Sequence, residues 1–485
     1  MSDKNSYLKS PDLMPVGSNE RKVGTGGFAI MWVGMAVVLA AFAIGGDGVV
    51  ALPLGWVVVS AFIGCLLIGL VITVVGDIGI EHGLSFPVYA RAPFGTIGTH
   101  IPSVTRGVTA SVWFGINTFF GASAINGILT ILTGFDNWFL CYAIFATAQI
   151  INTAIGIKAV ERFADFAAPV IILISIWIYY VLSGEAASQG NSIWNSVEAP
   201  AYGVSAVSVF LIVIFSVMGF WATLGTDIPS ISRFIKGPKY EKNFFKRNKG
   251  AFIGNMITMP IVQTFMVLIG GVAYIALGNF DPVVALQETA SGIVLAILLV
   301  MIVLAQWSTN TTANVIPAAV IFSNAGGPKV PFYAGVILAG LIGTAFQPWA
   351  LFEVIVPYLL LSGAILSAII GIVMVDYYIL RKRRVNVPDL YKSEGQFRYH
   401  NGVNLAGIIS WVIGGGVAML FMDYSFIFGF VIGGGCYYFL AKHWYFKKFK
   451  QEEIENPDDE KYLGLTVGRD WQIDMEEDKK DKISV

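Results

Sequence analysis

Long apolar runs separated by short polar segments extend along most of the chain. A helix of about 20 apolar residues crosses the roughly 30 Å hydrocarbon layer of a bilayer, where its backbone satisfies its own hydrogen bonds. The pattern predicts an all-α polytopic membrane protein. Its twelve predicted transmembrane helices are residues 27–47, 53–76, 105–132, 137–156, 164–182, 204–225, 250–276, 291–315, 332–348, 352–379, 403–422 and 425–445.

Lysine and arginine gather on alternate connections between these runs. One set of connections and bordering helix ends holds Arg91, Arg106, Lys158, Arg162, Arg233, Lys236, Lys239, Lys242, Lys246, Arg247, Lys249, Lys329 and the run from Arg381 to Arg384. The other set, at 134–138, 183–203, 278–291, 347–351 and 423–424, holds none. Positively charged loops stay in the cytoplasm, so we expect a multi-pass protein of the cell (inner) membrane with cytoplasmic N- and C-termini.

The composition agrees with a membrane location. Hydrophobic residues make up 55% of the chain and charged residues only 13%, whereas soluble domains carry about 25% charged residues. Residues 1–26 form a polar cytoplasmic segment without the features of a cleavable signal peptide. Residues 446–485 are predicted to be a cytoplasmic charged tail, solvated and mobile from Gln451 onward.

The predicted helices lack the residue patterns of an enzyme. All four histidines fall in predicted cytoplasmic loops or at helix ends, and the three cysteines lie singly inside apolar runs. No nucleophile with a base, no metal-ligand spacing and no phosphate-binding loop occurs within the helices. We therefore expect a transporter and not an enzyme.

Glycines interrupt the first and sixth predicted helices. The first contains Gly34 and the group Gly45, Gly46 and Gly48, and the sixth contains Gly219 and Gly225. Transporter helices unwind at such places and expose carbonyls to substrates and ions, although glycine also serves close helix packing. The first and sixth helices stand five apart in the order of the chain, which fits an inverted repeat of five plus five helices. The two halves would be residues 27–182 and 204–379, followed by two further helices at 403–445.

Two helices carry polar side chains that cannot face lipid. Residues 304–318 read LAQWSTNTTANVIPA, in which Ala305, Ser308, Thr309 and Thr312 recur at steps of three and four. Their oxygens suit a small cation such as Na⁺, unless the hydroxyls return hydrogen bonds to their own helix. In the third helix, Trp113 and Asn117 share one face, which suits stacking on a flat ring and bonding its edge; packing alone is the competing interpretation.

Five segments together resemble the nucleobase:cation symporter-1 family. They are HGLSFPVYARAPFGTIG, WFGINTFFGA, GFWATLGTDIPSISRF, WSTNTTAN and VDYYILRKRRVNVPDLY, and the resemblance extends from about Asp12 to the twelfth predicted helix. Members of this family carry hydantoins, allantoin, purines, cytosine, uracil and related compounds. The resemblance implies twelve helices, with a leucine-transporter-like inverted repeat in the first ten.

The resemblance also assigns residues to sites. It places an aromatic sandwich for the substrate at Trp113 and Trp221, amide contacts at Asn117 and Asn314, and Gly219 and Phe220 on the same wall as Trp221. For sodium-coupled members it implies carbonyls at Gly34 and Val37 together with Ala305, Ser308 and Thr309. No cofactor is implied beyond the coupling ion.

Three positions depart from the family pattern. Val38 replaces an amide side chain of some relatives, which disfavours allantoin, and Phe220 fills a position that is small in some relatives and narrows the pocket. The Asn and Asp usual around the Ile-Pro pair of the sixth helix are here Asp227 and Ser230. Asp227 either contributes to proton coupling or gating, or pairs with a loop cation.

The expected function is import of a planar nucleobase-like heterocycle together with Na⁺ by alternating access. Proton coupling of the same substrate class, and a transporter-like receptor that binds without transport, are the alternatives. The expected partners are this small molecule, Na⁺ or H⁺ and the lipid bilayer, without nucleic acid, and a monomer is favoured.

Overall fold

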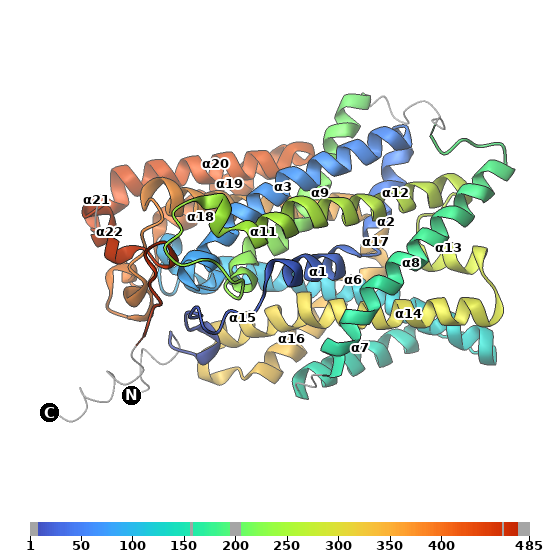
Figure 1. Ribbon diagram of the computed structural model, residues 1–485, viewed down its shortest axis with the longest axis horizontal. Coiled ribbons are helices and arrows are strands. Elements are labelled where there is room, and N and C mark those ends of the chain that lie inside the picture. Colours follow the sequence, from blue (N-terminus) through green and yellow to red (C-terminus); the bar gives the residue numbers. More distant parts are fainter. Residues whose placement is uncertain (1–7, 156–158, 195–204, 458–459, 474–485) are drawn as a thin grey trace.

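The computed structural model describes residues 8–155, 159–194, 205–457 and 460–473, which form helices and connecting loops without a β-strand (Figure 1). Eight helical segments within these ranges are long and apolar enough to cross a membrane. They are Leu54–His82 (α3), His100–Thr133 (α6), Trp138–Ile155 (α7), Ala206–Ser232 (α9), Lys249–Leu277 (α11 and α12), Gly292–Gly326 (α14 and α15), Ile355–Leu380 (α18 and a π-helical turn) and Met422–Lys448 (around α20).

The remaining predicted helices are bent or short. Thr25–Ala36 (α1) and Ala41–Val49 (α2) meet at 57° and form a ninth span if they are counted together. Shorter apolar helices are Ile172–Ser188, the last part of α8 (Ala159–Ser188), together with Phe332–Ala345 (α16) and Leu405–Leu420 (α19). The all-helical membrane fold is confirmed, and each predicted run overlaps one of these helices, but the count of twelve spans stays a prediction.

The first predicted helix is broken between α1 and α2. Val37, which follows α1, has φ −77° and ψ 73°, outside the helical region. The chain turns through residues 38–40, where the amide of Ala41 donates to Val38 O at 3.1 Å, and α2 begins at Ala41. The prediction that this helix unwinds is confirmed, although the break lies between the glycines and not at them.

The sixth predicted helix is not broken. Helix α9 is continuous from Ala206 to Ser232, so the prediction that it unwinds near Gly219 and Gly225 is wrong for this conformation. A Cβ added at Gly219 would lie 2.0 Å from Leu359 O on α18 (Ile355–Met374). The glycine therefore permits close helix packing, which is the competing interpretation of its presence.

Three arginines near helix ends are paired with buried carboxylates. Asp77 and Glu81, at the end of α3, bind Arg247 at 2.9 Å and 3.1 Å, and Glu81 also binds Arg383 at 3.0 Å. Arg381 binds Asp376 at 2.8 Å. These arginines belong to the connections that the charge pattern assigns to one side of the membrane, and which side that is stays a prediction.

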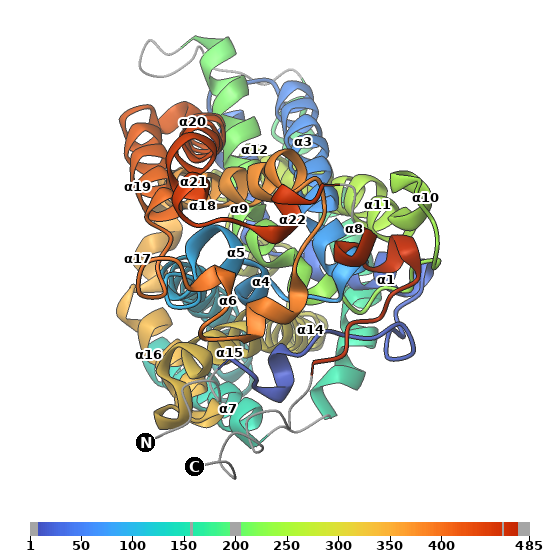
Figure 2. The same cartoon turned by 90° about the vertical axis from the view of Figure 1, so that its left-hand side faces the viewer.

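Residues 451–457 and 460–473, here called the C-terminal strap, lie across these helix ends (Figure 2). Glu453 is buried and pairs with Arg381. The amides of Gly464 and Thr466 each donate to Glu81 Oε1 at 3.1 Å. The interpretation of this part of the chain as a mobile, solvated tail is wrong, because its charged and backbone groups bind buried partners on the helix ends.

The strap also contacts the segment before α1. Asp470 accepts hydrogen bonds from the backbone amide of Ser18 at 3.0 Å and from Lys239 Nζ at 2.8 Å. Partial burial raises the pKa of Asp470, but the bonds from Lys239 and Ser18 lower it by more, so the net shift is downward. Asp470 is therefore a carboxylate at neutral pH, and it joins both terminal segments to the loop after α9.

Candidate functional site

A small cavity lies where the break after α1 faces α6, α9 and the π-helical turn Thr311–Val315 between α14 and α15. Its volume of about 50 Å³ has room for a few water molecules. The side chains that give it chemical character are Arg106, Trp113, Asn117, Phe220, Trp221 and Asn314. Five of these six are residues that the sequence assigned to the substrate.

Helix α6 contributes a polar and aromatic stripe to the cavity. Asn117 lies four residues after Trp113 and Arg106 seven before it, and these spacings place all three on one helix face. All three side chains are buried. Asn117 Oδ1 has no hydrogen-bond partner among the described residues, so an amide oxygen is available to a ligand beside the indole.

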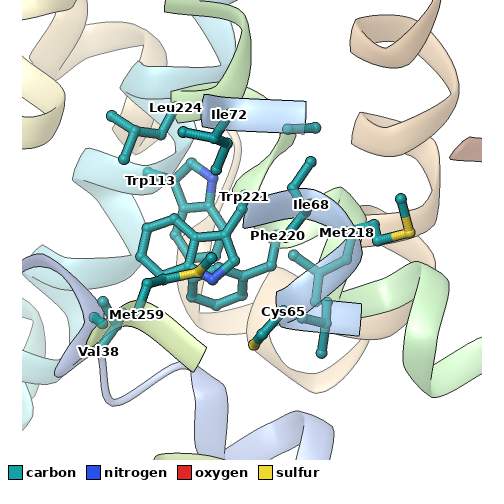
Figure 3. Packing of buried hydrophobic residues seen from close by; sticks show 14 of the residues in the cluster. Val38, Cys65, Ile68, Ile72, Trp113, Met218, Phe220, Trp221, Leu224 and Met259 are labelled. Carbon is teal, nitrogen blue, oxygen red and sulfur yellow. The ribbon is translucent and has the colours of Figure 1, made fainter. Parts of the chain in front are cut away.

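Phe220 lies in contact with both tryptophans (Figure 3). Its ring centroid is 4.6 Å from that of Trp113 and 5.2 Å from that of Trp221. Trp32 of α1 packs edge-on against Trp221 at 5.1 Å. Both indoles line the cavity as expected, but a flat ligand between them requires the Phe220 ring to move or the helices to separate.

Asn314 is held by a hydrogen-bond network that connects three helices. Asn310 Nδ2 donates to Phe114 O at 3.0 Å, to Thr118 Oγ1 at 3.1 Å and to Gln149 Oε1 at 2.9 Å. Asn314 Nδ2 donates to Asn310 Oδ1 at 3.0 Å. The π-helical turn places these two asparagines where α6 and α7 meet helix α14, and such turns often mark functional sites.

An ion pair completes one side of the cavity. Arg106 Nη2 lies 3.5 Å from Asp227 Oδ2, and both side chains are buried. The hydroxyl of Ser230 donates to Asp227 Oδ1. Of the two interpretations of Asp227, pairing with a cation is found, but the cation is a buried residue of α6 and not a loop residue.

Arg106 is the charged cavity residue that sequence reasoning missed. The charge pattern groups it with the basic loops and the helix ends that border them, because it lies near the start of its helix. Its spacing of seven from Trp113 was the available signal, because residues seven apart share a helix face. Asn310 and Gln149 were also not assigned to the site, since Asn310 acts through Asn314 and Gln149 lies on another helix.

The residues expected to bind Na⁺ are only partly gathered at the cavity. Thr309 lines it, and so does Val38, the residue after Val37. Ala305, about one turn before Thr309, and Ser308, the residue next to Thr309, are buried on α14 but do not line the cavity. Gly34, a predicted sodium ligand, and Gly219, a predicted substrate residue, do not line the cavity. The Thr312 hydroxyl donates to Ser308 O at 3.1 Å, so this residue returns a hydrogen bond to its own helix.

The donor set still fits a hard monovalent cation. Unwinding at residues 37–40 interrupts the helical bonding of carbonyls in α1, and hydroxyl and carbonyl oxygens are the ligands that such cations prefer. Within the described ranges, no group of three or more His, Cys, Asp and Glu side chains has the arrangement of a metal site. A cation at this place would therefore be held by neutral oxygens.

Comparisons with known proteins agree on one class of membrane protein. Residues 15–441 match a family model described as "Permease for cytosine/purines, uracil, thiamine, allantoin". The hydantoin permease of Microbacterium maritypicum is 29% identical over 468 residues, 93% of each chain. The allantoin permease of Bacillus subtilis is 26% identical over 86% of this chain and 88% of its own.

Solved structures give the same result. The chain resembles the inward-facing conformation of Mhp1 with a TM-score of 0.85 and 27% identity, covering 94% of this chain and 98% of Mhp1. It resembles a closed conformation of Mhp1 with bromovinylhydantoin bound with a TM-score of 0.81 and 26% identity, covering 93% and 99%.

Proposed function

The chain belongs to the nucleobase:cation symporter-1 family of permeases, and on this premise we propose that it is a secondary active symporter that imports a planar nucleobase-like heterocycle with Na⁺ by alternating access. The observation that carries the substrate assignment is the cavity where Trp113, Trp221, Asn117 and Asn314 meet at the break in the first helix. The candidate substrates are purine and pyrimidine bases, hydantoins and allantoin.

Stacking and amide contacts provide the binding energy and the selectivity. A base stacked on an aromatic side chain gains about 1–3 kcal/mol, and two indoles offer two such surfaces. Amide side chains both donate and accept hydrogen bonds, so they match the edges of a lactam or imide and set the orientation of the ring. A ligand with the wrong edge leaves a buried amide unpaired, which costs binding energy.

The break in helix 1 supports coupling to Na⁺. Carbonyl oxygens at Gly34 and Val37, with Ala305, Ser308 and Thr309 on α14, are the proposed ligands of the ion. Cation and substrate would then both hold the helix-1 break against α14, so each favours the conformation that binds the other. The Mhp1 structures, one inward facing and one closed, support alternating access as the transport mechanism.

The location and assembly of the chain follow from the same proposal. We place it in the cell membrane as a monomer, with the end that carries the C-terminal strap and the basic loops in the cytoplasm. Proton coupling is the second candidate, because Asp227 contacts the cavity through Arg106.

Uptake into proteoliposomes tests the coupling ion. Labelled heterocycles are supplied with an inward Na⁺ gradient in one series and an inward proton gradient in the other, and unlabelled purines, pyrimidines, hydantoins and allantoin compete. We expect Na⁺ to drive uptake. In the Ser308→Ala, Thr309→Ala double variant, which removes two of the five proposed ligands, we expect the Na⁺ concentration for half-maximal uptake to rise.

Thr311→Ala is the matched control, because the Thr311 hydroxyl already donates to Trp307 O at 2.9 Å and has no proposed contact with the ion. Uptake driven by the proton gradient alone would contradict sodium coupling. A double variant with the sodium dependence of the unaltered protein would contradict the placement of the ion.

A further inference from the structure

Arg106 lines the cavity, and its guanidinium carries hydrogen-bond donors without a partner among the described residues. Asp227 is its ionic partner at 3.5 Å through Nη2. The Nε and Nη1 groups, both buried, find no hydrogen-bond partner in the described part of the chain. A buried charged group with unpaired donors is costly, and the residue lines a cavity that a ligand enters. Arginine only donates, so the missing partner is an acceptor.

Asn314 is another polar group of the cavity, and its hydrogen bonds fix the orientation of its amide. The carbonyl of Phe114 only accepts, so the atom of Asn310 that lies 3.0 Å from it must be the nitrogen. Asn310 Oδ1 then faces Asn314, which must donate through Nδ2. This order of bonds leaves Asn314 Oδ1 as an acceptor on the cavity side, and the amide cannot flip without breaking the network.

We infer that Arg106 is a specificity-determining residue, and that the cavity selects heterocycles that present a ring N–H to Asn314 and a ring carbonyl oxygen to Arg106. The inference rests on the proposed function and narrows its substrate class to oxo heterocycles. An amino-substituted ring presents an N–H donor at the place of the carbonyl oxygen. This donor cannot accept from Arg106, which only donates, so the guanidinium donors stay unpaired.

Asp227 acts through Arg106 as a positioning residue. Its carboxylate neutralises the guanidinium while no ligand is bound. The pair therefore adds no net charge to the cavity that an uncharged heterocycle enters. The 3.5 Å separation and the contact through Nη2 alone show that the carboxylate does not use the full guanidinium fork. The Nε and Nη1 donors therefore stay available to a carbonyl without loss of the ion pair.

Calorimetric binding to the purified full-length protein tests this selectivity. Hypoxanthine and adenine form one matched pair, in which a ring carbonyl is replaced by an amino group. 4(3H)-Pyrimidinone and 4-aminopyrimidine form another, and hydantoin is an additional oxo ligand. Within each pair that binds, we expect the oxo compound to have at least about tenfold higher affinity than the amino compound, because it gains a hydrogen bond to a charged group.

The variant that removes the donors without an unpaired charge is Arg106→Met with Asp227→Asn. Replacing both members of a buried pair avoids the cost of leaving one charge alone, and thermal unfolding verifies that the variant is folded. We expect it to lose the oxo-over-amino preference, with little change in affinity for the amino ligands. Thr223→Val, which changes another cavity residue to one of similar shape, is expected to retain the preference.

The outcomes separate this inference from the proposed function. Equal affinity for oxo and amino ligands, or a preference that survives in the folded double variant, would overturn the role of Arg106 and leave the transporter proposal intact. If none of the five compounds bound, the proposed function itself would fail, and the inference with it.

Discussion

Phe220 determines how much room the two indoles leave for a ligand. Its ring contacts both Trp113 and Trp221 in a cavity of about 50 Å³. A stacked heterocycle therefore requires a shift of this ring or a separation of α6 from α9. In the proposed function the aromatic residues therefore have two tasks: they stack on the substrate when it is bound, and they pack against one another when it is absent.

Substitution of the two tryptophans tests the stacking role. We expect Trp113→Ala and Trp221→Ala each to weaken heterocycle binding by about tenfold or more, since each removes one stacking surface worth roughly 1–3 kcal/mol. Phe220→Ala is expected to widen the cavity and to admit ligands with bulkier substituents. Titration of purified protein with labelled ligand measures these changes.

Trp138→Ala provides the control for loss of a large indole away from the cavity, because Trp138 packs against Trp349 and Tyr142. We expect it to lower thermal stability and to leave affinity unchanged. Wild-type affinity in both cavity tryptophan variants would show that the ligand binds elsewhere.

The sequence predicted individual cavity residues correctly where residue spacing and family resemblance agreed. Trp113, Asn117, Phe220, Trp221 and Asn314 all line the cavity. Arg106 was missed because a positive charge near a helix end ordinarily marks a loop. A one-dimensional pattern does not show how far a long side chain reaches into the protein, and that reach is what brings Arg106 to the cavity.

Irregular helices position the site. The first helix unwinds at residues 37–40, and a π-helical turn at Thr311–Val315 directs Asn310 and Asn314 toward different neighbours. The glycines predicted that the first helix breaks, but they did not locate the break. Glycine occurs both where a helix unwinds and where helices pack closely, so its positions do not distinguish the two. The π-helical turn was not predicted, since its stability depends on partners in α6 and α7.

The C-terminal strap is the element whose structure differs most from the expectation. Its composition is that of a solvated tail, yet Glu453 is 1% exposed and pairs with the buried Arg381. Charge runs predict solvation only when no complementary charges are close in space. Here the complementary arginines lie on helix ends that are distant in sequence.

The Glu453 pairing gives a stability prediction. Glu453→Ala leaves Arg381 with Asp376 as its carboxylate partner among the described residues. Removing one member of a buried pair costs about 3–5 kcal/mol when no second partner compensates. Asp376 still pairs with Arg381, so we expect the loss of stability to lie below this range. The midpoint of thermal unfolding in detergent is then expected to fall by several degrees.

Glu455→Ala is the matched control. Glu455 lies two residues further along the strap and pairs with Lys450 at the surface, where an ion pair contributes about 0–1 kcal/mol. We expect little change in its unfolding midpoint. Equal effects of the two substitutions would contradict a structural role for the buried pair.

The whole molecule joins its two ends on one face. The strap binds the end of α3, the loop after α9 and the segment before α1, through Glu81, Lys239 and Ser18. The same face carries the basic connections that the charge pattern grouped together. The positions of the apolar helices could be predicted because each apolar run is a local feature of the sequence. The number of spans and the side of the membrane on which the basic connections lie stay predictions.

The central claim is that the chain moves a heterocycle across the membrane and does not only bind it. The most direct test is counterflow: proteoliposomes that contain the purified protein and a high concentration of unlabelled heterocycle are diluted into a trace of the same labelled compound. We expect labelled compound to accumulate transiently inside, and the Trp113→Ala, Trp221→Ala double variant to abolish this accumulation. Tight binding of the heterocycle without counterflow would contradict transport and identify the chain as a receptor.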